Sequence, residues 1–308
     1  MRVARRSATV VQMPAVAAAA ARRRPSEWAR GWRRFKRYRP GLVGLGFITV
    51  LIVLALFPDT FAPHSYTQVF RGMRGAPPTW SHPLGFDHIG RDVLSRIMWG
   101  SRVALIVGLL ATGIAVVIGV VVGAAAGYLG GRVDTILSRL IDTLMAYPLL
   151  VLLITLAAVL GPSLVTVVVI IGFSTWAQYA RVVRADVLSL RERDFVLAAL
   201  AAGASTGRII LRHIVPNVLS PVIVIASLGI GGIILLEAAL SFLGLGAQPP
   251  TPSWGSMLAD GRSFILIYPH IAIAPGVMIS LTVLAFNLMG DGLRDALDPR
   301  QKDMPLAL

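Results

Sequence analysis

The chain has 308 residues, of which 56% are hydrophobic and only 14% are charged, and its mean hydropathy is +0.74. A soluble domain usually carries about a quarter charged residues, so the composition excludes an ordinary soluble protein and indicates a membrane protein. Cysteine is absent, which excludes a disulfide framework, a thiolate metal site and a cysteine nucleophile.

The N-terminal tail carries the strongest charge asymmetry. Twelve of the 29 Lys and Arg residues precede Pro40, against the single acid Glu27. Short flanking segments rich in Lys and Arg stay in the cytoplasm, so we expect a cytoplasmic N-terminus and no nucleic-acid partner despite the net charge of +14. We expect residues 1–24 to be a disordered basic tail, because the apolar run Met13–Ala21 is too short and too weak for a signal peptide.

Residues 25–40 are predicted to form an interfacial helix on the inner leaflet. Ser26 can cap its start, and Trp28, Trp32 and Phe35 then fall on one face with arginines on the others. A plain basic anchor next to the membrane is the alternative.

Long uncharged runs predict six membrane crossings, since about 17 apolar residues are the lower limit for one. The runs are Gly41–Pro58, Val103–Gly131, Thr143–Ala180 as two crossings with a turn at Leu160–Leu164, Ile214–Leu236, and Ser263–Gly290, whose start Pro269 and Pro275 trim or kink. The expected fold is an all-α integral membrane protein of six transmembrane helices. Its segments are a first helix at 41–58, an external loop at 59–100, a five-helix core at 101–291 containing a cytoplasmic loop at 191–216, and a cytoplasmic tail at 292–308.

The external loop offers a candidate metal trio in His82, Asp87 and His88, but their spacing fits no standard site. We expect instead a turn that leads into a helix, with Asp92 and Arg96 paired one turn apart. Residues 58–102 also contain five arginines, and the N-terminal tail outweighs them in setting the orientation.

A stripe of small residues follows in the second crossing. It recurs every fourth position, as Ala111, Ala115, Gly119, Gly123, Gly127 and Gly131. Such a stripe lets another helix backbone approach closely, so Gly119, Gly123 and Gly127 are predicted packing positions. The partner helix can belong to this chain or to a second subunit.

Few carboxylates lie near the crossings. Asp142 is expected to pair with Arg139 at the cytoplasmic entry of the third crossing. Glu237 follows 23 uncharged residues and is the candidate for the translocation path. It lies 20 residues beyond Asn217, or about 30 Å along a helix, so a wet carboxylate at the outer surface is the other interpretation.

The stretch FVLAALAAGASTGRIILRHIVPN, from Phe195 to Asn217, is too polar to cross the membrane. It predicts two short helices joined at Gly203, the second anchored by Ile209, Ile210 and Ile214. Such a unit is either a docking surface or a plain cytoplasmic connector.

This stretch resembles the EAA loop of ABC-importer permeases. Ala198, Ala199, Gly203, Ile214 and Pro216 fill the positions of that motif, and Leu197 stands where the family has glutamate. The stretch HPLGFDHIGRDVLSRIMWGSRVAL resembles the external motif of the peptide/nickel importer permeases. Two further stretches, LSFLGLGAQPPTPSWGSML and LTVLAFNLMGDGLRDALDP, look like the C-type subunit of dipeptide and glutathione systems. The resemblance covers about residues 28–300.

The resemblance implies the type I importer permease (MetI-like) fold in a bacterial inner membrane. The implied partners are a B-type permease subunit, two ATP-hydrolysing subunits and an extracytoplasmic substrate-binding protein, with membrane lipid around the complex. The segment 195–217 would be the coupling helix, with contact candidates Ala198, Ala199, Gly203, Ala204, Ser205, Ile209, Arg212, Ile214 and Pro216.

The chain itself excludes one enzymatic role. A Walker A loop needs a lysine after glycine, and the two lysines stand in FKR and QKD, so another chain must hydrolyse ATP. No cofactor is expected. The alternatives are a proton-coupled secondary transporter using Glu237 and His270, an intramembrane hydrolase, for which no Ser/His or paired Asp constellation is found, and a non-transporting scaffold.

Overall fold

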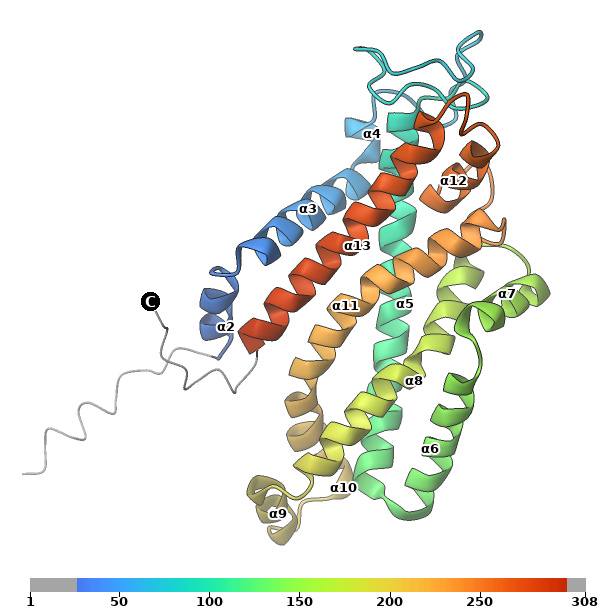
Figure 1. Ribbon diagram of the computed structural model, residues 1–308. Helices are drawn as coiled ribbons and strands as arrows, with labels where there is room; N and C mark the ends of the chain where they lie inside the picture. Colours follow the sequence, from blue (N-terminus) through green and yellow to red (C-terminus); the bar gives the residue numbers. More distant parts are fainter. Residues whose placement is uncertain (1–26, 298–308) are drawn as a thin grey trace, which may run out of the picture.

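The computed structural model describes residues 27–297, with side chains from Gly31 onward, and our expectations for residues 1–24 and 298–308 lie outside this range. Between residues 27 and 297 the chain forms helices joined by loops (Figure 1). In this range there are two isolated β-bridges and no extended β-strand. The helices are α2 (Glu27–Phe35), α3 (Arg39–Leu56), α4 (Pro58–Phe61), α5 (Val93–Leu129), α6 (Gly131–Ala146), α7 (Leu149–Leu160), α8 (Leu164–Leu190), α9 (Asp194–Ala201), α10 (Thr206–Ile209), the π-helical turn η1 (Ile210–Ile214), α11 (Val215–Phe242), α12 (Trp254–Arg262) and α13 (His270–Leu297).

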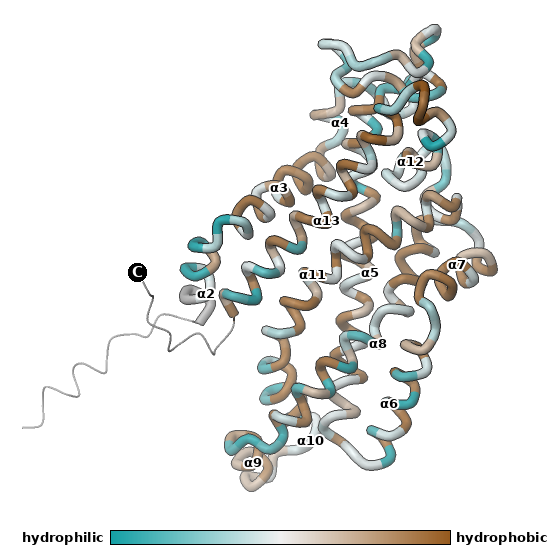
Figure 2. The backbone as a smooth tube through the Cα atoms, viewed as in Figure 1, coloured by the Kyte–Doolittle hydropathy of each residue, from teal (hydrophilic) through white to brown (hydrophobic). Residues whose placement is uncertain are grey.

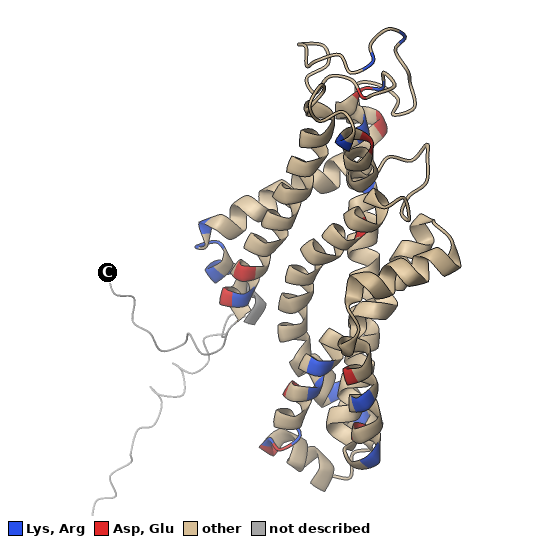
Figure 3. Ribbon diagram, turned by 45° about the vertical axis from the view of Figure 1, so that its right-hand side comes forward, with Lys and Arg blue, Asp and Glu red and all other residues tan. Residues whose placement is uncertain are grey.

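Five helical stretches are long and apolar enough to cross a membrane. They are α3, α5, α8, the continuous stretch from α10 to α11, and α13. Helices α6 and α7 meet at 87° and count as a sixth crossing when the two are taken together as one broken span, as the sequence predicted. The crossing helices are mostly hydrophobic along their middle sections (Figure 2), and charged residues gather toward the two ends of the molecule (Figure 3).

The third crossing departs from a simple helix. It begins at Gly131, well before the expected entry at Asp142, and it breaks at Tyr147 and Pro148. Pro148 supplies no backbone N–H, and a residue before proline avoids the helical region. Tyr147 accordingly has extended dihedrals of φ −81° and ψ 138°. The proline therefore divides one crossing into two short helices.

Several helix starts follow from local sequence. The Asp92 carboxylate accepts a hydrogen bond from the Ser95 N–H and so caps α5. Ser163 caps α8 in the same way through the Thr166 N–H, and Ser253 forms a capping box with Ser256 at α12. These caps fix where the chain turns at the outer end.

Helix α2 lies against the ends of α3 and α13. Phe35 is buried beside Gly41 and Gly292 and stacks on Trp32, with ring centroids 5.6 Å apart. Trp32 is half exposed, so one aromatic ring of the predicted face packs on protein and the other remains free. The side chain of Trp28 lies outside the described residues.

Helix α5 packs closely on α8 at the small-residue stripe. A Cβ placed on Gly123 would lie 2.5 Å from the Ala180 carbonyl oxygen, and one on Gly127 would lie 2.8 Å from the Val187 Cβ. Gly119 faces Tyr179 in the same way. Helix α8 of the same chain thus occupies this face, and the second-subunit alternative does not apply here.

Replacement of Gly123 by leucine should prevent α5 and α8 from packing, because the added side chain would occupy the space of the Ala180 carbonyl. We expect the Gly123→Leu protein to be lost or aggregated in detergent size-exclusion chromatography. Gly113→Leu is the matched control, since a Cβ on Gly113 meets nothing within 4 Å. Equal monodisperse yields of both variants would contradict the packing.

Candidate functional sites at the two ends of the bundle

The candidate site that we expected in the cytoplasm comprises α9, α10 and η1, which connect α8 to α11 (Figure 1). Helix α9 ends in a Schellman motif, in which the Ala204 N–H donates to the Ala199 carbonyl and the Gly203 N–H donates to that of Leu200. Gly203 has φ +79°, a conformation that glycine adopts without strain. The glycine therefore sets the turn between the two short helices.

Buried aliphatic residues hold this segment on the bundle. Val196, Ile209 and Ile214 are buried, and they pack in one cluster with residues of α5, α8 and α11, including Val187 and Val218. Ile209 and Ile214 therefore anchor the segment and have no free surface for a partner. Among the other predicted contact residues, Ala198, Gly203, Ser205, Arg212 and Pro216 are exposed, and Ala199 and Ala204 are half-buried.

The water-facing side of the segment is unexpectedly apolar. Phe195, Leu197, Leu200 and Leu211 are 42%, 50%, 58% and 69% exposed. We call these four residues the apolar docking face. Exposed apolar patches of this kind mark interaction sites. The sequence analysis singled out only Leu197, because a short apolar run does not reveal which of its residues face outward.

Ion pairs between helices fasten α6 to α8 above this segment. The Arg181 Nη2 atom lies 2.7 Å from the Asp142 Oδ1 atom, and the Arg184 Nη2 atom lies 2.8 Å from the Asp134 Oδ2 atom. The predicted pair between Asp142 and Arg139 is wrong, because α8 lies alongside α6 and offers Arg181 instead.

Glu237 is enclosed by protein at 1% exposure. The Ser241 hydroxyl donates a hydrogen bond of 2.6 Å to its Oε1 atom. The interpretation of Glu237 as a wet interfacial carboxylate is wrong, because α12 folds back over this part of α11, with Gly255 directly against Ala238. In this conformation Glu237 does not line an open path.

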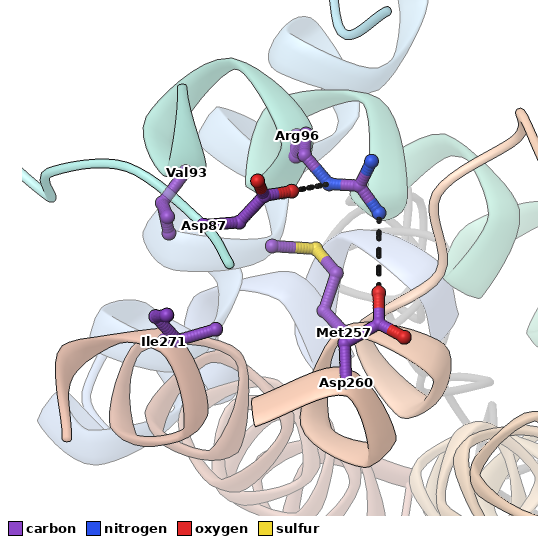
Figure 4. A pocket seen from close by; sticks show the side chains of 6 residues that line it. All are labelled: Asp87, Val93, Arg96, Met257, Asp260 and Ile271. Atoms are coloured by element: carbon purple, nitrogen blue, oxygen red, sulfur yellow. Dashed lines mark ion pairs between the residues drawn. The ribbon is translucent and has the colours of Figure 1, made fainter. Parts of the chain in front are cut away.

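The external candidate site is a charge cluster that joins three segments (Figure 4). The buried Arg96 of α5 lies between Asp87 of the loop, at 3.6 Å, and Asp260 of α12, at 3.9 Å. Arg91 also pairs with Asp87, with 2.6 Å between its Nε atom and the Oδ2 atom. Val93, Met257 and Ile271 supply the apolar walls of this small pocket.

One expectation for this region is wrong, and the rejected metal trio is accounted for by other contacts. Arg96 does not pair with Asp92, because the Asp92 carboxylate is used by the Ser95 N–H and by His82, whose Nδ1 atom is 3.0 Å away. The candidate metal trio is dispersed, since Asp87 pairs with Arg91 and the His88 ring stacks on Phe264. Between residues 27 and 297 there is no cluster of three metal-ligating side chains.

The external cluster is a clamp, not a reaction centre. Its two arginines and two aspartates neutralise one another and tie the loop to α5 and α12. Beside it, the buried Trp254 donates its indole N–H to the Ile97 carbonyl at 3.0 Å, which fixes α12 on α5. A clamped cap over a bundle of long apolar helices, with exposed apolar residues at the opposite end, defines a multi-pass membrane protein.

Comparison with known families identifies the subunit. Residues 115–303 match the family described as "Binding-protein-dependent transport system inner membrane component", and residues 26–78 match the "N-terminal TM domain of oligopeptide transport permease C". The chain belongs to this family of ABC-transporter permeases, which confirms the resemblance seen in the sequence. It is a multi-pass inner-membrane protein.

Curated relatives match nearly the whole chain. The dipeptide transport system permease protein DppC of Alkalihalophilus pseudofirmus is 44% identical over 277 residues, covering 90% of this chain and 91% of the relative. The glutathione transport system permease protein GsiD of Shigella flexneri is 43% identical over 299 residues, covering 97% and 98%. The DppC protein of Escherichia coli K12 is 46% identical over 277 residues, covering 88% and 92%.

A solved structure supports the fold. The crystal structure of an amino acid ABC transporter with histidines aligns at a TM-score of 0.50 and 17% identity, covering 64% of this chain and 92% of that one. With the family match, it confirms the expected importer-permease fold.

Replacement of Arg96 by alanine should destabilise the outer cap. Removing one partner of a buried ion pair typically costs about 3–5 kcal/mol, because the remaining charge is left uncompensated. The control is Arg102→Ala on the same helix, where an exposed arginine lies over the Trp99 ring and typically contributes about 0–1 kcal/mol. The check is the midpoint of thermal unfolding in detergent, and equal midpoints for both variants would contradict the clamp.

Proposed function

We propose that the chain is the C-type permease subunit of an ATP-driven, binding-protein-dependent importer for dipeptides, oligopeptides or similar small solutes such as glutathione. The observation that carries the proposal is the 41–46% identity, over nearly the full length, to permeases named for dipeptide and glutathione transport. The chain forms half of the translocation path.

The other half comes from a B-type permease subunit, and ATP is hydrolysed by two further subunits. The lysine count supports this division, since neither lysine can complete a Walker A loop. The apolar docking face supports an ATPase contact at α9, because its four apolar side chains remain 42–69% exposed in this chain. A substrate-binding protein delivers solute at the opposite, external end.

Coupling follows from how α9 is held. Val196 and Ile209 connect the short helices to α8 and α11, so a push on the docking face reaches two crossing helices at once. Helix α8 packs on α5 at the glycine contact, and ion pairs join it to α6, so α5 and α6 move with it. Closure of the ATPases thus moves a rigid group of helices and alternates access to the path.

A proton-coupled mechanism has less support. Glu237 is enclosed and bonded to Ser241, and the His270 Nε2 atom lies 3.0 Å from the Phe86 carbonyl oxygen. Glu237 thus faces no open space from which a proton would be taken up, and the half-buried His270 is engaged by a main-chain carbonyl.

The proposed orientation places the N-terminus, the C-terminus and α9 in the cytoplasm and the loop before α5 outside. In cells stripped of any outer membrane, an impermeant thiol reagent should label Thr79→Cys and leave Ala202→Cys unlabelled. Both positions are exposed, and the chain has no cysteine of its own. Lysis should make Ala202→Cys reactive, and the reverse pattern in intact cells would place α9 outside and refute the ATPase contact.

Substitution of Gly203 by aspartate should uncouple transport. Nothing in the described part of the chain lies within 4 Å of a Cβ at this position, so an added group would project away from the bundle toward the proposed partner. A charge brought into an apolar contact has to be desolvated, which should weaken ATPase docking more than about tenfold. Peptide uptake and co-purification of the ATPases should both fall while membrane insertion stays normal.

Matched variants separate charge from backbone strain. Gly203→Asn has nearly the same shape and the same tolerance of positive φ without the charge, so it should retain more uptake. Leu197→Glu restores the residue of the resembling motif and should be tolerated, whereas Leu200→Glu on the same exposed face should uncouple. Normal transport by Gly203→Asp with its ATPases attached would refute the coupling assignment.

A further inference from the structure

The break between α6 and α7 leaves main-chain groups without partners. Helix α6 ends at Ala146 and α7 begins at Leu149. Within residues 27–297 nothing donates a hydrogen bond to the last three carbonyl groups of α6, because Pro148 has no N–H and α7 turns away by 87°. The first three N–H groups of α7 are likewise unpaired. The break is therefore a polar backbone site.

This site lies near the middle of the apolar layer. On the α6 side, Leu144 packs in the cluster that contains Trp176 of α8. On the α7 side, Leu153 packs in the cluster that contains Ile171. The break thus lies level with the stretch between Ile171 and Trp176, inside the uncharged run 164–180. Ile171 is about 10 Å from the start of the run, and Trp176 is about 6 Å from its end.

No residue between 27 and 297 covers the break on its outer side. Tyr147 is 61% exposed, and Ala146 and Pro148 are exposed as well. Irregular backbone at this depth is not tolerated against lipid and occurs only where it is buried in protein or lines a water-filled cavity.

Polar side chains continue from the break toward the cytoplasm. The ion pair between Asp142 and Arg181 joins α6 to α8. Ala146 lies one turn beyond Asp142 on α6, and Gln178 lies one turn before Arg181 on α8. Both residues therefore lie on the same helix faces as the ion pair. Gln178 is exposed and has no hydrogen-bond partner within the described range. An unpaired amide and an exposed ion pair favour water over lipid on this face.

We propose that the break at residues 146–148, together with Gln178, lines the solute path and hydrogen-bonds the amide and ammonium groups of peptide-like solutes as they pass. The carbonyl groups at the end of α6 carry partial negative charge, which suits N–H donors, and broken helices supply such groups in other transporters. The Tyr147 hydroxyl and the Gln178 amide add side-chain partners. This inference rests on the function proposed above.

Accessibility to water in the complete importer tests the inference. Because the chain contains no cysteine, Tyr147→Cys and Gln178→Cys each give a single labelling position. Val50→Cys is the control, since it is 58% exposed on the unbroken helix α3. A charged maleimide should label the two path positions in inside-out or right-side-out vesicles, at rates that change when ATP and vanadate trap the complex. Val50→Cys should react only with a lipid-soluble maleimide.

The result that would overturn the inference is a Tyr147→Cys protein as unreactive as Val50→Cys on both sides and in both states. Uptake of a radiolabelled dipeptide by the unsubstituted complex is measured in parallel. Absence of ATP-dependent uptake there would refute the proposed function, whereas transport with an unreactive Tyr147→Cys refutes only the path assignment.

Tyr147→Phe tests the hydrogen-bonding role, because it keeps the ring and removes the hydroxyl. The maximal uptake rate should fall about threefold to tenfold, as for the loss of one hydrogen bond, with ATPase co-purification unchanged. An unchanged rate would overturn the role of the hydroxyl.

Discussion

The need to pair backbone polar groups within a hydrocarbon layer is the constraint on which the rest of this structure depends. This constraint makes every crossing helical. It also makes any interruption of a helix costly, unless other groups or water form hydrogen bonds to the backbone groups that the interruption frees. Five crossings obey the rule without a break. The third does not, since Pro148 divides it at mid-depth, and a departure from the rule at that depth is maintained only where it has a use.

Glycine determines how closely the unbroken helices lie. At Gly123 the main chain of α5 touches that of α8, and at Gly44 the main chain of α3 touches that of α13 near Ala285. Such contacts leave few side chains free to rearrange, so the joined helices move together. The short helices below and the charge cluster above then act on one body, which is the mechanical requirement for a subunit that receives force at one end and opens at the other.

The sequence predicted features that depend on composition and local pattern, and it missed those that depend on neighbours distant in the chain. Uncharged runs located the crossings, and the small-residue stripe indicated a close contact without naming α8. Our expected ion pairs joined residues within one helix, whereas Asp142 pairs with Arg181, 39 residues away. Glu237 was misjudged for the same reason, because the segment that covers it follows later in the chain. The distance of Glu237 along α11 could be counted in the sequence, but its burial beneath α12 could not.

The two ways of fastening helices to α8 respond differently to the medium. The α5 contact is van der Waals packing, which dissolved salt leaves almost unchanged. The α6 contact relies on ion pairs that remain partly open to water, with the Arg181 and Asp142 side chains 52% and 60% exposed. Mobile ions weaken exposed pairs over a Debye length of about 8 Å at physiological ionic strength. The α6 half of the broken crossing is thus attached to α8 in part by contacts that dissolved salt weakens.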